Sequence, residues 1–165
     1  MILILMRHGD AEVYDPDRSD SERQLTEKGQ LKVHNMVKLA HVLWPDNGVL
    51  WSSSLIRAKQ TAGILQKELA IKPVKYSSMI ETGDLAAVAK TILCDNTQTP
   101  VVIVGHEPFL GRWLYQLTGA TIEFKKAAFA VIDYLPVTDE IGEGTLLAYV
   151  QPKLEKLLNQ EAIRL

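Results

Sequence analysis

The sequence predicts an α/β protein, a three-layer α/β/α sandwich built on a mixed but mostly parallel central sheet. Three short apolar runs, typical of strands buried on both faces, lie at Ile2–Leu5, Val49–Trp51 and Val101–Val104. Segments with apolar residues at helical spacing separate these runs, and this alternation is the pattern of a sheet covered by helices. Two strand-like segments follow one another near the C-terminus, and the hairpin they form makes the expected sheet mixed.

Four of the expected helices share an apolar face and a recognisable start, either a capping side chain or a proline. They are a helix after Thr26 whose apolar face runs from Val33 to Leu43, a helix from about Leu55 to Leu69 with Ser54 as its cap, a helix from Leu85 to Leu93 with Asp84 as its cap, and a helix that starts at Pro108. The two late strands are expected at Ala127–Leu135 and Thr145–Val150, with an acidic, glycine-containing turn from Thr138 to Gly144 between them. A short amphipathic helix is expected from Lys153 to about Ala162.

The composition is that of an ordinary globular domain. The chain has 165 residues, 18 Lys and Arg against 20 Asp and Glu, and one cysteine. With no internal repeat or linker, this length predicts a single domain over residues 1–165. The net charge of −2 indicates no nucleic-acid or membrane surface. No apolar run approaches the roughly 20 residues of a membrane span. The lone Cys94, without a signal peptide, leads us to expect a cytoplasmic protein.

Several common chemistries have no motif in this sequence. There is no G-x-x-x-x-G-K-[ST] loop, and Gly142 and Gly144 do not continue into G-x-G-x-x-G because Leu147 stands where the third glycine is needed. No H-E-x-x-H or paired-cysteine pattern for zinc occurs. The residue six places after Cys94 is Pro100 rather than arginine, which excludes the signature of cysteine phosphatases.

Basic side chains follow three of the predicted strands. Arg7 and His8 close the first strand, Arg57 lies in the first turn of the helix after the second, and His106 follows the third. Because the carboxyl ends of parallel strands meet at one edge of a sheet, we expect these side chains to lie together. Two guanidinium groups match the oxygens of a tetrahedral dianion, and a neutral imidazole is a competent nucleophile toward phosphorus. The sequence therefore predicts a site for phosphoryl chemistry.

Four segments that contain these residues resemble the landmarks of the histidine phosphatase (phosphoglycerate mutase-like) superfamily in order and approximate spacing. They are Arg7-His8-Gly9-Asp10-Ala11, Arg23-x-Leu25-Thr26-x-x-Gly29, Ser53-x-x-x-Arg57-Ala58-x-Gln60-Thr61 and Gly105-His106-x-Pro108. The match covers roughly residues 1–118. The short chain and its opening motif make it most similar to the SixA-type phosphohistidine phosphatases.

The resemblance implies a phosphoglycerate mutase-like fold and a phosphatase that uses no metal and no other cofactor. His8 would be the nucleophile that becomes phosphohistidine. Arg7, Arg57 and a protonated His106 would bind the phosphoryl oxygens and stabilise the transition state. We also expect Gly9 and Ser53 on the phosphate side of the site.

Arg23 belongs to one of the matching segments, and its role is open. A loop salt bridge and a substrate-facing position are equal alternatives for it. His34 and His41 lie on the polar side of a predicted helix, and we expect both at the surface.

Larger members of this superfamily carry an acid that protonates the leaving oxygen. Glu81 is the candidate here, and a solvated loop position is its alternative. Imidazole leaves from phosphohistidine far more easily than an alkoxide, because the conjugate acids have pKa values of about 6.5 and about 15.7. A site without a dedicated acid should therefore favour P–N bonds.

These considerations predict a substrate and its rivals. The expected partner is a phosphohistidine-containing protein, such as the phosphotransfer domain of a phosphorelay, with phosphate or another oxyanion in the site. We expect a monomer that binds neither nucleic acid nor membrane. Rival interpretations are a small-molecule phosphomonoesterase, which an inward Glu81 would favour, and a catalytically silent phosphate-binding module. A third is a metal-dependent hydrolase that uses His8, His106 and a carboxylate such as Asp10.

Overall fold

The computed structural model describes residues 1–40, 43, 48–69, 71, 73–94, 98–138, 140–154 and 157. Its elements are β1 (Ile2–Arg7), η1 (Asp20–Glu22), α1 (Glu27–Ala40), β2 (Val49–Ser52), α2 (Ile56–Leu69), β3 (Lys75–Tyr76), α3 (Ser78–Thr82), α4 (Leu85–Val88), η2 (Ala89–Leu93), β4 (Val101–Gly105), α5 (Phe109–Thr118), β5 (Phe129–Val137) and β6 (Glu140–Val150). Of the expected tail helix, residues 153, 154 and 157 are helical and the rest lies outside the described residues, as does His41.

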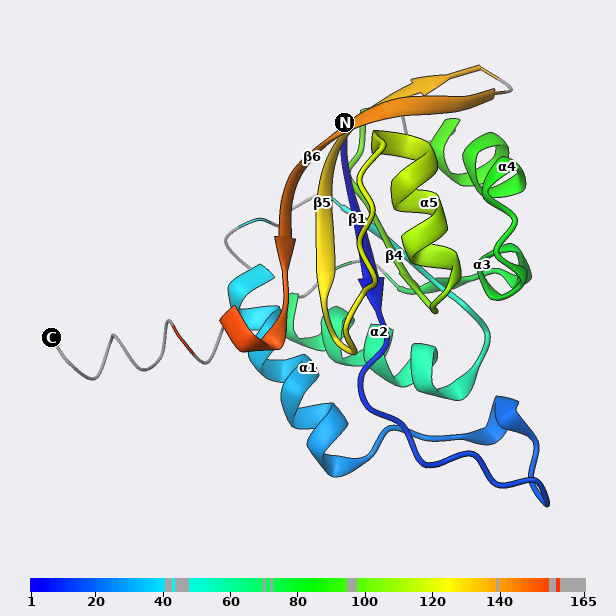
Figure 1. The fold of residues 1–165 in the computed structure, drawn as a ribbon, viewed down its shortest axis with the longest axis vertical. Helices are drawn as coiled ribbons and strands as arrows, with labels where there is room; N and C mark the ends of the chain where they lie inside the picture. Colours follow the sequence, from blue (N-terminus) through cyan, green and yellow to red (C-terminus); the bar gives the residue numbers. More distant parts are fainter. Residues whose placement is uncertain are drawn as a thin grey trace, which may run out of the picture.

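The central sheet has six strands in the order β3-β2-β4-β1-β5-β6. The first four of these are parallel, whereas β5 runs antiparallel to β1 and β6 antiparallel to β5. The prediction of a mixed, mostly parallel sheet is therefore confirmed. Because β4 lies between β1 and β2, three strands that are distant in the sequence end side by side (Figure 1).

Helices cover both faces of this sheet, as the three-layer prediction requires. Alternate residues of β1 face opposite sides, because successive side chains of a strand point in opposite directions. Leu3 and Leu5 pack with α3, α4, η2 and α5, while Ile4 and Met6 pack with α1 and α2 (Figure 1). All four of these side chains are buried. No helix in the described part of the chain is long and apolar enough to cross a membrane.

The segment between β1 and α1 leaves the body of the protein and returns to it. An isolated antiparallel bridge between Ala11 and Leu25 closes its base. Thr26 caps α1 as predicted, since its Oγ1 accepts a hydrogen bond from the amide of Gly29 at 3.0 Å. A Cβ on Gly29 would lie 2.0 Å from the carbonyl oxygen of Asp10, so only glycine allows this close approach.

The predicted turn from Thr138 to Gly144 is wrong, because β6 already begins at Glu140 and pairs with β5 from there. The glycines have a packing role instead. A Cβ on Gly142 would lie 2.1 Å from the carbonyl oxygen of Leu135, and the Gly142 amide donates to the Tyr134 hydroxyl at 3.0 Å. A glycine inside a strand often marks such a close approach of another backbone.

Two short elements, β3 and α3, were not predicted. Ser77 caps α3, since its Oγ accepts a hydrogen bond from the amide of Met79 at 3.2 Å. Asp84 caps the next helix as predicted, with its Oδ1 accepting from the amide of Ala87 at 3.0 Å. The cap expected at Ser54 is not formed. The hydroxyl of the preceding Ser53 accepts from the amide of Leu55 at 3.2 Å instead.

Candidate active site

The ends of β1 and β4 and the start of α2 bring four basic residues together. Arg7 is the last residue of β1, His8 follows it, His106 follows β4, and Arg57 is the second residue of α2. His8, Arg57 and His106 are only 6%, 7% and 5% exposed. The rings of the two histidines lie 5.0 Å apart between centroids. The sheet edge therefore gathers the side chains that the sequence placed at separate strand ends.

The hydrogen bond made by His8 defines which of its ring nitrogens carries the proton. Nδ1 lies 2.7 Å from the carbonyl oxygen of Gly9. Because a carbonyl oxygen can only accept, Nδ1 donates, and the lone pair of the neutral ring is on Nε2. Burial, together with His106 and the guanidinium groups of Arg57 and Arg7, lowers the pKa of His8 to about 3. At neutral pH the ring is therefore uncharged and nucleophilic at Nε2.

His106 differs from expectation in its charge. Burial, together with Arg57 and Arg7, lowers the pKa of His106 to about 4, although the carboxylate of Asp20 opposes this. The resemblance implied a protonated His106 beside a phosphoryl group, and in the protein without a bound anion the lowered pKa favours the neutral ring. A dianion beside the ring favours the charged form and should raise this pKa.

Three buried nitrogen atoms at this site have no hydrogen-bond partner among the described residues. They are Nε of Arg7 and both ring nitrogens of His106, and the only other such side-chain atom in the described part of the chain is Nε1 of Trp51. Buried donors are normally satisfied, so a cluster of unpaired ones indicates a place for an acceptor. An oxyanion with several oxygen atoms fits this donor set.

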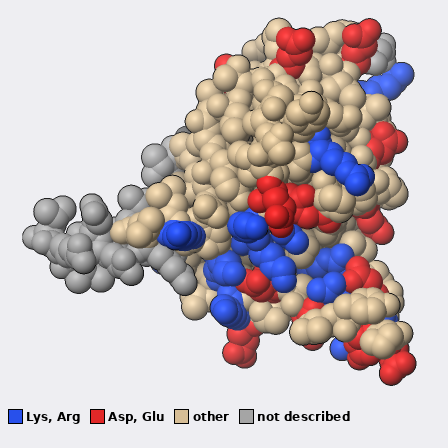
Figure 2. All heavy atoms as spheres, viewed as in Figure 1, with Lys and Arg blue, Asp and Glu red and all other residues tan. Residues whose placement is uncertain are grey.

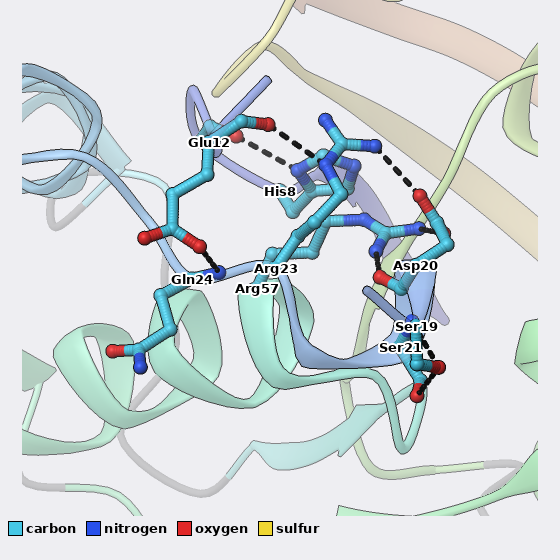
Figure 3. Close-up of polar contacts among 9 residues, drawn as sticks. His8, Glu12, Ser19, Asp20, Ser21, Arg23, Gln24 and Arg57 are labelled. Atoms are coloured by element: carbon cyan, nitrogen blue, oxygen red, sulfur yellow. Dashed lines mark hydrogen bonds and ion pairs between the residues drawn. The ribbon is translucent and has the colours of Figure 1, made fainter. Parts of the chain in front are cut away.

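Arg57 is held by Asp20, a residue of η1 (Figure 3). Nη2 of Arg57 donates to Oδ2 of Asp20 at 2.8 Å, and Nη1 donates to the Asp20 carbonyl oxygen at 2.7 Å. Nη1 of Arg23 donates to the other carboxylate oxygen, Oδ1, at 2.7 Å. Arg23 therefore forms the loop salt bridge that was one of its two alternatives, and it does so on a carboxylate that also binds Arg57.

Sequence reasoning missed Asp20. The one available signal was its spacing to Arg23, because oppositely charged residues three apart can pair within a helical turn. Nothing in the sequence indicated that Arg57, 37 residues further along, binds the same carboxylate. The hydrogen bonds from Arg23 and Arg57 lower the pKa of Asp20, so its carboxyl group stays ionised.

Gly9 and Ser53 shape the site through their backbones and small size. The amide of Gly9 donates to Oγ1 of Thr61 at 3.2 Å, and a Cβ on Gly9 would lie 2.8 Å from the Val33 side chain. Ser53 is fully buried, and its amide donates to the carbonyl oxygen of Val104 at 3.0 Å, which ties the end of β2 to β4.

Glu81 does not lie in a solvated loop. It belongs to α3, it is half-buried, and its Oε2 accepts a short hydrogen bond from the hydroxyl of Ser54. The expected loop position was wrong because the capping of α3 by Ser77 was not recognised. Ser54 follows the end of β2, so Glu81 is tied to the rim of the sheet edge through this hydroxyl.

Asp10 forms ion pairs with lysines. Its carboxylate pairs with Lys32 and, at 3.7 Å, with Lys126. No group of three His, Cys, Asp or Glu side chains that could hold a metal ion occurs within the described ranges. The structure therefore does not assemble His8, His106 and Asp10 into a metal centre. Figure 2 shows Lys and Arg side chains gathered around the C-terminal end of β1.

Glu107 holds the segment that anchors Arg7. Its Oε1 accepts from the amide of Phe124 at 2.7 Å, and the Phe124 carbonyl oxygen accepts from Nη1 of Arg7 at 2.6 Å. We expect Glu107→Ala to weaken binding of phosphate or tungstate by about tenfold, because the half-buried Arg7 loses its fixed position. Calorimetric titration measures this affinity. Glu123→Ala removes an exposed carboxylate of the same segment and should change the affinity less than about twofold. Equal affinities in the two variants would contradict a positioning role.

Comparisons with known proteins agree with this geometry. A sequence profile of the histidine phosphatase superfamily (branch 1) matches residues 3–85. An uncharacterized protein of Picosynechococcus sp. is 31% identical over 134 residues, which cover 77% of this chain and 81% of that protein.

Solved structures share the fold. The structure of the protein histidine phosphatase SixA complexed with tungstate matches with a TM-score of 0.81 at 22% identity, over 93% of this chain and 99% of that chain. A mutant of the phosphoserine phosphatase of Entamoeba histolytica, in complex with phosphoserine, matches with a TM-score of 0.68 at 12% identity, over 92% of this chain and 98% of that chain. The phosphoglycerate mutase-like fold expected from the sequence is thus confirmed.

Proposed function

The chain belongs to the histidine phosphatase superfamily, and from this premise we propose that it is a metal-independent phosphatase that acts on phosphohistidine in a protein. The observation that carries the proposal is the arrangement at His8. Its ring is neutral, Nδ1 is fixed by the carbonyl of Gly9, and unpaired donors of Arg7 and His106 lie in the same site. This arrangement suits attack on a phosphoryl group whose oxygens these donors hold.

The proposed reaction has two displacements at phosphorus. In the first, the lone pair on Nε2 of His8 forms a bond to phosphorus while the bond from phosphorus to the leaving group breaks. Arg7 and Arg57 neutralise the phosphoryl oxygens, and His106 donates to them. In the second, the oxygen of water forms the new bond to phosphorus while the bond to Nε2 of His8 breaks, so the neutral His8 ring is restored with its proton on Nδ1, and phosphate leaves with both hydrogens of the water. Holding His8 by Nδ1 keeps Nε2 aimed at the same phosphorus in both steps.

The carboxyl groups near the site favour a leaving group that needs no strong acid. Asp20 is held ionised by Arg23 and Arg57, so it is a poor proton donor. Glu81 is engaged by the hydroxyl of Ser54. An imidazole whose second ring nitrogen is protonated leaves phosphorus as a neutral molecule, whereas an alkoxide requires a proton from the enzyme. This contrast supports a P–N substrate over a phosphate ester of an alcohol.

The proposed partner is a phosphotransfer domain that carries phosphohistidine. Such a substrate would place the protein, as a monomer, in a cytoplasmic signalling phosphorelay. The cluster of lysines around Asp10, from Lys28 and Lys32 of α1 to Lys126, suits an acidic surface on this partner.

Phosphate release from two substrates tests this function. The assay contains EDTA and compares a phosphohistidine-bearing phosphotransfer domain with phosphoserine at equal concentration. We expect the P–N substrate to turn over at least about 100-fold faster in kcat/KM, the lower range of what general acid catalysis contributes to ester cleavage. Equal or faster turnover of phosphoserine would favour a small-molecule phosphatase. Loss of all activity in EDTA would contradict the metal-independent reaction.

A further inference from the structure

The carboxylate of Asp20 occupies two arginines at once. Oδ2 accepts from Arg57 at 2.8 Å and Oδ1 accepts from Arg23 at 2.7 Å (Figure 3). Paired arginine donors bind carboxylates and phosphates with matching geometry. Asp20 is therefore a carboxylate ligand supplied by the chain itself, seated where an acidic group of a bound molecule could otherwise bind.

Asp20 lies on the solvent side of the buried site. The side chain of Arg57 is 9% exposed, whereas that of Asp20 is 45% exposed. Its short helix η1 has no buried residue, so this carboxylate lies on the solvent-exposed side of Arg57. The carboxylate also acts on the interior, because its charge opposes the lowering of the pKa of His106. Asp20 thus stands between solvent and the basic cluster.

In-line displacement leads us to expect the leaving group on the solvent-exposed side of the site. The attacking and leaving atoms are roughly in line through phosphorus, so the leaving group projects away from His8. His8 is only 6% exposed, whereas the side chain of Asp20, which binds Arg57 of the same site, is 45% exposed, so we expect the leaving group to project toward the side of the site on which Asp20 meets solvent. A negative charge on the leaving group would therefore meet Asp20, with the donors of Arg23 and Arg57 already engaged.

We propose that Asp20 is a specificity-determining residue that excludes substrates whose leaving group carries a carboxylate. The charges balance for a plain phosphoryl group. With His106 neutral, Arg7, Arg23 and Arg57 contribute three positive charges, Asp20 contributes one negative charge, and a phosphoryl dianion neutralises the remainder. A second anionic group would be left without a counter-charge, whereas a neutral or cationic leaving group, such as the imidazole of a protein, meets no repulsion. The inference rests on the proposed function and specifies its substrate class.

The test compares two matched esters in the full chain with Asp20→Asn. Phenyl phosphate and 4-carboxyphenyl phosphate differ only by the carboxylate on the leaving group. We expect Asp20→Asn to raise kcat/KM for the carboxylated ester, relative to phenyl phosphate, by about tenfold, because the asparagine side chain has one acceptor oxygen, so one of the two arginine donors becomes available, and a repelling charge is lost. Taking the ratio within each variant removes differences in folding yield and in leaving-group reactivity.

Glu22→Gln is the matched control. Glu22 belongs to the same short helix and is exposed, and the structure shows no ion pair from its side chain within the described ranges. This variant removes the same charge two residues away without touching Arg23 or Arg57. We expect its ratio to stay within about twofold of that of the unmodified protein, as for an ordinary surface charge.

A purely structural role for Asp20 would give a different result. If Asp20 only orients Arg57, Asp20→Asn lowers kcat/KM for both esters by the same factor, and the unchanged ratio overturns the proposal. An equal rise of the ratio in Glu22→Gln also overturns it, because the effect would then come from net charge.

A binding measurement separates this inference from the proposed function. Phenylphosphonate and 4-carboxyphenylphosphonate are not hydrolysed, and calorimetry gives their affinities for the protein and for Asp20→Asn. A tenfold change in the ratio of the two phosphonate affinities, in a protein that turns over neither the phosphohistidine substrate nor the esters, would sustain the role of Asp20 and reject the phosphatase function. Turnover of these substrates with an unchanged ratio of phosphonate affinities would sustain the phosphatase function and reject the role of Asp20. If neither phosphonate binds at millimolar concentration, both are rejected.

Discussion

Replacing His8 by alanine is expected to abolish phosphate release, with kcat falling by at least about 10⁴-fold, as when other enzymes lose their covalent nucleophile. The reason is local to the ring. Nε2 of His8 is the atom whose lone pair is free, because Nδ1 donates to the Gly9 carbonyl oxygen. Alanine leaves the backbone of the strand end in place and removes this nucleophile.

Chemical trapping identifies the intermediate directly. After rapid mixing with a ³²P-labelled phosphohistidine substrate, the unmodified protein should carry a label that is lost in acid and retained in alkali, and His8→Ala should carry none. His34→Ala is the matched control, because the side chain of His34 is 41% exposed and pairs with Glu68 outside the site. Label or turnover that persists in His8→Ala would reject the covalent mechanism.

Mild acid is expected to destabilise the folded protein through the same histidines. Burial is the first cause of the low pKa of both rings, about 3 for His8 and about 4 for His106. An unfolded chain has ordinary histidines with a pKa of about 6.5, so it binds protons first as the pH falls. The stability that the neutral rings contribute is therefore complete above pH 6.5 and is lost as the pH drops toward the folded-state values. Between about pH 6.5 and 4.5 each ring should cost about 2–3 kcal/mol of unfolding free energy.

Urea denaturation at several pH values between 7 and 4.5 measures this loss. In His8→Asn or His106→Asn, one of the two titrating rings is absent, and the loss over this interval should be roughly half of that in the unmodified protein. Ordinary Glu side chains, with a pKa of about 4.3, begin to titrate at the lower end of this interval, and the comparison of each variant with the unmodified protein removes their shared contribution. A flat profile in the unmodified protein, or one that neither variant changes, would show that these rings are not buried as neutral groups.

The predictable part of the fold came from patterns that span neighbouring residues. The apolar runs of β1, β2 and β4 identified three strands because a strand buried on both faces has no polar alternation. The caps at Thr26 and Asp84 marked helix starts correctly, because a cap is a contact within one turn. The predicted turn from Thr138 to Gly144 was wrong because Gly142 is needed for packing against the neighbouring strand. A Cβ at this position would collide with the carbonyl oxygen of Leu135 and the hydroxyl of Tyr134.

The short elements were missed for a related reason. The two residues of β3 have no pattern of their own, and they form a strand because β2 lies beside them. The five residues of α3 are too few for helical periodicity to be recognised, so Glu81 was expected in a loop. Its hydrogen bond to Ser54, 27 residues away, exists only once the chain is folded.

The sequence by itself determined the architecture and the basic residues at the strand ends, since both follow from local order along the chain. Which charges meet, and which protons are present, was decided by the tertiary structure. Asp20 binds Arg57 across 37 residues, and Arg7 binds the Phe124 carbonyl oxygen across 117. The neutral state of His106 likewise results from burial beneath distant segments, because desolvation penalises a charge only when the folded chain excludes water.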